Sequence, residues 1–170
     1  MKNISAENAI NSKAINSKLK TDEKENENKA DLTLLNEIHK TAELGKLSLE
    51  TIINKIKDVP FKNVLLSEYQ SYDAMTSKIS VAITELNKTP KSSATAKASA
   101  MKTTIKIKLA FNDSPAHIAD MLIKGNNMGI ITINKRLNEV KDDCTNKSTE
   151  LAKDLLELEQ KQIDELKTYL

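Results

Sequence analysis

The sequence is poor in the residues that build turns and cross-links. Its 170 residues include three glycines, three prolines and one cysteine, and aromatic residues make up 3% with no tryptophan. Sandwiches, barrels and dinucleotide-binding folds need many turn or phosphate-loop glycines, so the scarcity of glycine argues against these classes. The core must come from Leu, Ile, Val, Met and Ala, and we predict an all-helical protein.

Charge and targeting features are also weak. Lys and Arg number 26 against 24 Asp and Glu, and this formal net charge of +2 gives no general attraction to nucleic acid or membrane. No apolar run approaches the ~18 residues that span a bilayer. Residues 1–30 contain neither the apolar stretch of a secretory signal nor any arginine. The lone Cys144, in a polar turn between two expected helices, indicates an exposed thiol and no oxidising compartment. We expect a cytoplasmic protein with no membrane partner and no specific nucleic-acid partner.

Residues 1–30 differ in composition from the rest of the chain. A duplicated pentamer, AINSK, occupies 9–13 and 14–18, and residues 21–29 contain no apolar side chain. Such a segment buries too little surface to offset its ordering entropy. We predict a flexible or disordered N-terminal arm over 1–30, either a solvated tail or a docking arm that folds on a partner, followed by one helical domain over 31–170.

From Asp31, a good helix N-cap, apolar residues recur at alternating spacings of three and four. This heptad pattern is typical of long helices packed at shallow angles. Pro60 should end the first helix, and Ser114 with Pro115 should begin the third. Gly45 on the first stripe indicates that another backbone approaches there. The expected long helices are 31–58, 62–87, 115–140 and 148–169.

The connection between the second and third helices is long, whereas the other two loops are short. Residues 91–112 within it show helical spacing at Met101, Ile105 and Leu109, although they also alternate as a strand would. Two helical hairpins joined by one long crossover is the ferritin-like topology. We therefore predict a ferritin-like antiparallel four-helix bundle with a helical crossover.

A local sequence supports the same class. Residues 117–125, HIADMLIKG, with Met128, Gly129, Ile130 and Ile131, resemble the third helix of small uncharacterised bacterial ferritin-like proteins. The resemblance implies a di-metal site at the centre of the bundle, with one Glu from each of two helices and a Glu-x-x-His motif from each of the other two.

The expected ligand set is incomplete here. Glu68 and Glu159 occupy inward stripe positions on the second and fourth long helices, but Ser71 and Gln162 stand where the histidines belong. Three interpretations of the two acids remain open: a buried polar network satisfied by neighbours such as Tyr72 and Gln162, a slightly rotated helix with its Glu at the edge, or a weak metal site with Glu68 and Glu159 as ligands.

Other polar features have weaker interpretations. His39 and His117 lack the metal-ligand spacing and are expected at the surface or an interface. Gly125 and Gly129 form a small-x-x-x-small pair that predicts close approach of two helices, within the bundle or across a dimer. Six lysines over 88–108 with no acid among them form a basic surface suited to contact with anions.

Three functional hypotheses follow. The first is a non-catalytic, ferritin-like structural or interaction protein without an intact di-iron centre or cofactor, self-associating as a homo-oligomer, with a dimer favoured. The alternative is an iron- or manganese-binding redox or storage protein with atypical ligands including Glu68 and Glu159. The third is an anion-binding module that uses the lysine-rich 88–108 segment.

Overall fold

The computed structural model describes residues 3–91 and 96–170, and the side chains of residues 3–17, 96, 97 and 141 lie outside the description. Its described residues form five α-helices and no strand, with short 3₁₀ turns over Lys141–Asp143 and Lys167–Tyr169. The all-helical prediction is thereby confirmed. The helices are α1 Asn3–Ile53, α2 Val59–Glu85, α3 Ala96–Phe111, α4 Pro115–Val140 and α5 Asn146–Leu166.

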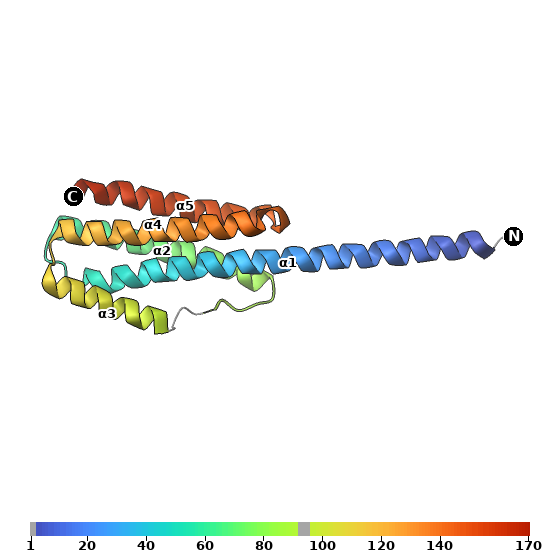
Figure 1. Cartoon of the computed structure of the whole chain (residues 1–170), viewed down its shortest axis with the longest axis horizontal. Helices are drawn as coiled ribbons and strands as arrows, with labels where there is room; N and C mark the ends of the chain where they lie inside the picture. Colours follow the sequence, from blue (N-terminus) through green and yellow to red (C-terminus); the bar gives the residue numbers. More distant parts are fainter. Residues whose placement is uncertain (1–2, 92–95) are drawn as a thin grey trace.

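The helices form a bundle of two hairpins with α3 on its outside (Figure 1). α1 packs against α2, α4 and α5, and α5 packs against α2 and α4. α2 and α4 run in the same direction, opposite to α1 and α5, because the segment after α2 returns along the bundle before α4 begins (Figure 1). α3 lies within that returning segment and packs on α1. No helix in the described part of the chain is both long and apolar enough to cross a membrane.

The first helix departs from its predicted ends. α1 runs through Asp31 without a break and stops at Ile53, short of Pro60. Asp58 accepts a hydrogen bond from the backbone N–H of Phe61 and is the N-cap of α2, so Pro60 lies in the first turn of the next helix. Proline suits that position because the first-turn N–H groups have no partner within the helix.

Asp31 has a different role from the predicted cap of α1. Its carboxylate accepts hydrogen bonds from the backbone N–H and the hydroxyl of Thr145, at 2.9 and 2.8 Å. Thr145 is itself the N-cap of α5, where it accepts from the N–H of Ser148. A residue that resembles a local helix start therefore joins α1 to the loop between α4 and α5.

The N-terminal arm is helical and continuous with α1, and it projects well beyond the bundle (Figure 1). Residues 18–29 are all exposed, and burial begins at Asp31. This fits the compositional change that separates 1–30 from 31–170. Its flexibility and its division from the domain stay predictions.

Residues 96–111 of the crossover are helical, which confirms the helical choice over a strand; residues 92–95 lie outside the described part. α3 turns Ile105 and Leu109 to the core and leaves Ile107 and Phe111 exposed. The main core consists of aliphatic residues from all five helices with few aromatic ones, as the composition predicts. Its largest fully buried side chains are Tyr72, Phe61, Leu34, Leu35, Ile38, Leu49, Ile52, Leu65, Ile79, Ile83, Ile118 and Ile133.

Candidate functional site

A cluster of polar side chains lies inside the bundle. Its members come from three helices: α2 supplies Glu68 and Tyr72, α4 supplies Asn126, and α5 supplies Glu159 and Gln162. Glu68 is 4% exposed and Glu159 is 2% exposed. The inward placement of both acids is confirmed, and the interpretation that one of them sits at a bundle edge is wrong.

Glu159 is accommodated by a glycine on the neighbouring helix. A β-carbon on Gly129 of α4 would stand 2.9 Å from Oε1 of Glu159, closer than real β-carbon contacts allow. Within the bundle, Gly129 makes room for a carboxyl group of the neighbouring helix, and a β-carbon on Gly125 would meet nothing within 4 Å. Close approach of two helices across a dimer at this pair stays a prediction.

Tyr72 uses a second glycine in the same way. A β-carbon on Gly45 of α1 would lie 2.4 Å from Cζ of the Tyr72 ring. The prediction of a close backbone at Gly45 is wrong in its detail, because a buried aromatic ring occupies the space. With the ring held against α1, the Tyr72 hydroxyl reaches the centre of the cluster, where it donates to Oδ1 of Asn126 at 3.5 Å and interacts electrostatically with the Glu159 carboxyl.

Hydrogen bonding continues from α4 to α5 but leaves several atoms without partners. Nδ2 of Asn126 donates to Oε1 of Gln162 at 3.3 Å. Oε1 of Glu68, Oε2 of Glu159 and Nε2 of Gln162 are buried without a hydrogen-bond partner. Two unpartnered carboxyl oxygens in one interior cluster are unusual, because buried polar groups are normally satisfied.

Electrostatics favour the neutral forms of both acids. Burial raises the pKa of Glu68 to about 8, and the nearby charges of Glu165 and Glu159 add to the increase. Burial also raises the pKa of Glu159 to about 8, against the opposing effect of the Tyr72 hydrogen bond. The pKa of Tyr72 is raised well above its usual range, chiefly by burial. At neutral pH the cluster therefore carries two protonated carboxyls and little net charge.

A cavity of about 590 Å³ leads to this cluster from the side of α3. We call it the α1/α3/α4 groove, because those helices supply its walls, with Glu68, Tyr72 and Glu159 at its inner end. Its apolar lining includes Leu44, Leu49, Ile52, Met101, Ile105, Met121, Leu122 and Met128. Its volume is in the range of small-molecule sites, and a mostly apolar pocket with a few converging polar groups is the usual form of such a site.

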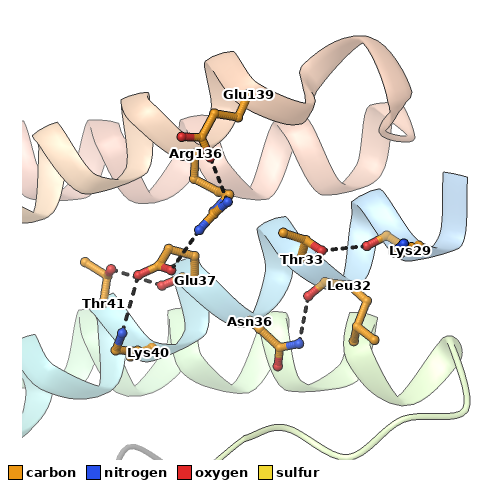
Figure 2. A network of polar contacts seen from close by, with 9 residues as sticks. All are labelled: Lys29, Leu32, Thr33, Asn36, Glu37, Lys40, Thr41, Arg136 and Glu139. Atoms are coloured by element: carbon orange, nitrogen blue, oxygen red, sulfur yellow. Dashed lines mark hydrogen bonds and ion pairs between the residues drawn. The ribbon is translucent and has the colours of Figure 1, made fainter. Parts of the chain in front are cut away.

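Charged residues of α1 and α4 define one part of the rim. Glu37, which lines the groove, pairs with Lys40 at 3.6 Å and with Arg136 of α4 at 3.7 Å (Figure 2). Arg136 also pairs with Glu139 at 2.7 Å, as Figure 2 shows. These ion pairs join α1 to α4 one helical turn beyond Thr132, another lining residue.

The donors in the cluster do not fit the di-iron centre that the ferritin-like resemblance implies. Such a centre needs further carboxylates and two imidazoles. Here the hydrogen-bonding side chains around Glu68 and Glu159 are a phenol and two amides, and the one further carboxylate near Glu68 is that of Glu165. Across residues 3–91 and 96–170 no group of three His, Cys, Asp or Glu side chains is placed to hold a metal ion. Glu68 and Glu159 remain a candidate ligand pair with no third strong ligand beside them.

Comparison with known protein families identifies the family of this chain. Residues 30–139 match the family described as a domain of unknown function, DUF2383. The chain belongs to this family. The DUF2383 match spans most of α1 beyond the arm, all of α2 and α3, and α4 almost to its end, so it includes every wall of the groove. Neither a curated protein nor a solved structure matches the chain.

The two histidines of this DUF2383 member lie away from the cluster. His39 is buried, contrary to the surface prediction, with Nε2 3.0 Å from the hydroxyl of Ser80. Burial lowers the pKa of His39, although Glu43 partly opposes this. The pKa of His39 is lowered because this residue, next to Ile38 on α1, faces α2 and is buried there. His117 is partly buried in the first turn of α4.

Cys144 is partly buried beside Asp31, and is less exposed than predicted. Burial, followed by the charges of Asp31 and Asp143, raises its pKa to about 12. A thiol with so high a pKa is almost entirely protonated and a poor nucleophile at neutral pH.

Sequence reasoning missed two components of the site. Asn126 is not among the candidate residues of the sequence, yet its amide connects Tyr72 to Gln162. The contribution of α3 to the groove wall, through Met101, Thr104, Ile105 and Lys108, was also missed. The signal available for Asn126 was its position three residues before Gly129 and four after Leu122, on the buried stripe of α4.

Proposed function

We propose that this DUF2383 protein is a non-catalytic, ferritin-like bundle protein that acts as a structural or interaction protein and lacks an intact di-iron centre. The observation that carries the proposal is the composition of the interior cluster. Two carboxyls with raised pKa values, a tyrosine and two amides occupy the centre of the bundle, where a ferritin-like di-iron protein has its carboxylate and histidine ligands.

The order of the helices supports the ferritin-like part of the proposal. Helices α2 and α4 run in the same direction, and the connection between them returns along the bundle through α3 (Figure 1). One long crossover between two helical hairpins is the arrangement of ferritin-like folds. The local resemblance over residues 117–131 lies on α4, whose glycine accommodates Glu159.

An exposed apolar surface supports an interaction role. Met128 and Ile131 are three residues apart on α4, with 70% and 67% of their surface exposed, and Met128 also lines the groove. Residues at this spacing are neighbours on a helix surface. We propose a homodimer that buries this surface, to be tested by sedimentation equilibrium of the native protein and of the Met128→Lys/Ile131→Lys variant. A monomeric native protein would contradict the dimer, and a dimer retained in the variant would exclude this face.

Elemental analysis tests the central proposal. Protein purified without chelator or affinity tag is expected to contain no stoichiometric iron or manganese and to take up neither when they are added. Glu68→Gln and Glu159→Gln should then fold with equal or higher stability at neutral pH, because a neutral amide replaces a carboxyl that is costly to ionise. Stoichiometric metal that disappears in Glu68→Gln would contradict the proposal and would favour the alternative of an iron or manganese protein with atypical ligands.

A further inference from the structure

The α1/α3/α4 groove gives the interior carboxyls a route to the surface. Gly125 and Gly129 both line it, so at these two positions no α4 side chain narrows the groove. The space above Gly125 is open, and the Glu159 carboxyl lies directly against Gly129. The groove therefore runs past these two glycines to the buried side chains of Glu159, Glu68 and Tyr72.

The inner end of the groove offers acceptor atoms without a matching donor. Oε1 of Glu68 and Oε2 of Glu159 have no hydrogen-bond partner, and both side chains are more than nine-tenths buried. No lysine or arginine is buried anywhere in the described part of the chain. An ammonium group beside these carboxyls would stabilise their ionised forms, which burial otherwise disfavours, so its binding at neutral pH should release protons from them. Its three N–H donors can then bond to the carboxylate oxygens.

The geometry points to a binding site for a primary alkylamine, with its ammonium group at Glu68 and Glu159 and its hydrocarbon body along the α1/α3/α4 groove. The apolar walls suit an alkyl body, and the methionines at 101, 121 and 128 can adapt to its shape. An anion would meet no buried positive charge at the inner end, and a wholly apolar molecule would leave the carboxyl oxygens unsatisfied.

The charges at the rim do not oppose entry of a cation strongly. Lys40 is paired with Glu37, and Lys124 is paired with Asp120 at 2.6 Å. Lys108 is the remaining rim lysine; it is exposed to solvent, where its charge is screened by salt. The buried acids, by contrast, lie where electrostatic interactions are strongest.

This inference rests on the proposed function in one respect, because it requires carboxyls that are free of metal. The two ideas fail separately. Stoichiometric iron or manganese in the purified protein would overturn the proposed function, whereas metal-free protein without affinity for an amine would overturn only the amine site.

The test is isothermal titration calorimetry of the metal-free full chain at neutral pH with hexylamine, 1-hexanol and hexanoate. These probes share one alkyl chain and differ in the head group. We expect hexylamine to bind with one-to-one stoichiometry and at least about tenfold more tightly than 1-hexanol, the factor expected for one charge-assisted hydrogen bond.

Two variants locate the bound amine. Glu159→Gln keeps the size of the side chain and its contact with Tyr72, and should weaken hexylamine binding about tenfold or more while leaving 1-hexanol binding unchanged. Gly125→Leu fills the groove at a position with no neighbour to clash, and should weaken all binding in the groove. Lys153→Gln on the exposed side of α5 is the matched control and should bind as the native chain does.

Three results would overturn the amine site. They are equal affinity for hexylamine and 1-hexanol, hexylamine binding that Glu159→Gln leaves unchanged, and tighter binding of hexanoate than of hexylamine. If hexanoate binds more tightly than hexylamine and Lys108→Gln abolishes that binding, the anionic head group would lie at the rim. Unfolding curves for each variant show whether it is folded, and Glu68→Gln replaces Glu159→Gln if the latter does not fold.

Discussion

The carboxyl of Glu159 on α5 lies against the α-carbon of Gly129 on α4, with Oε1 2.9 Å from the place a β-carbon would take. A methyl group at position 129 would have to displace a carboxyl that is already buried beside Tyr72. The polar cluster therefore depends on a residue with no side chain. Gly125, one turn earlier on the same helix, has no such neighbour and serves as an internal comparison.

We expect Gly129→Ala and Gly125→Ala to change stability in opposite directions. Gly129→Ala should lower the free energy of unfolding by about 1–3 kcal/mol, the usual cost of overpacking. Gly125→Ala should raise it by about 0.5–1 kcal/mol, because alanine is the better helix former and nothing obstructs its methyl group. Urea unfolding of the two variants measures both changes. Equal effects of the two substitutions would contradict the packing of Glu159 against Gly129.

Gly45→Ala should be more damaging than Gly129→Ala. Its β-carbon would lie within 2.8 Å of three atoms of the Tyr72 ring, which is buried and has little room to move. The free energy of unfolding should fall by about 3 kcal/mol, the upper end of the overpacking range. If the ring is the cause, Tyr72→Leu should recover much of the loss in the double variant, as thermal unfolding of the single and double variants would show.

Stability should fall as the pH rises through the neutral range. Glu68 and Glu159 have pKa values raised to about 8 in the folded protein, against 4.5 as the ordinary value. Between these pH values the folded chain holds protons that the unfolded chain has released, so their stabilising contribution is complete below about pH 4.5 and is lost as the pH passes 8. Urea unfolding from pH 5 to about 9 should show this decline.

Matched substitutions identify the groups responsible. Glu68→Gln/Glu159→Gln cannot ionise at either position, so its stability should change much less over the same pH range. Glu157→Gln, on the exposed side of α5, is the control and should keep the slope of the native protein. A slope that survives in the double variant would place the titration elsewhere.

His39 should reduce stability at the acid end. Burial lowers the pKa of His39 below 6.5 in the folded state, so the unfolded chain binds its proton more readily. The contribution of His39 is present above pH 6.5 and is lost as the pH falls through the folded pKa. In His39→Gln, whose amide can still bond with Ser80, the decrease in stability just below pH 6.5 should be shallower. A parallel loss in both proteins would contradict a role for His39.

Asp31 should stabilise the junction between α1 and the start of α5. Asp31→Ala removes the acceptor of two hydrogen bonds from Thr145 and should lower the free energy of unfolding by about 1–3 kcal/mol. Asp22→Ala, on the exposed arm, removes the same charge from the same helix and should have little effect. Amide hydrogen exchange should be faster at residues 144–148 in Asp31→Ala alone, and equal exchange in the two variants would contradict the junction.

The sequence determined the helical architecture through local rules. Scarce glycine and proline, together with apolar residues at spacings of three and four, predicted all five helices and the inward positions of Glu68 and Glu159, because periodicity alone fixes which face of a helix is apolar. The helix cap Ser114 and the proline after it are local features as well. They predicted where α4 begins, and the structure agrees.

Tertiary structure decided what the interior residues contact. The partners of Gly45 and Gly129 are side chains on other helices, Asp31 bonds with a residue 114 positions away, and Asn126 connects α2 to α5. None of these contacts leaves a periodic signal, because each depends on the rotation and offset of one helix relative to another. The groove has the same origin: it exists because α3 packs on α1 beside the face of α4 that carries Gly125 and Gly129, and that arrangement gives the buried carboxyls their access to solvent.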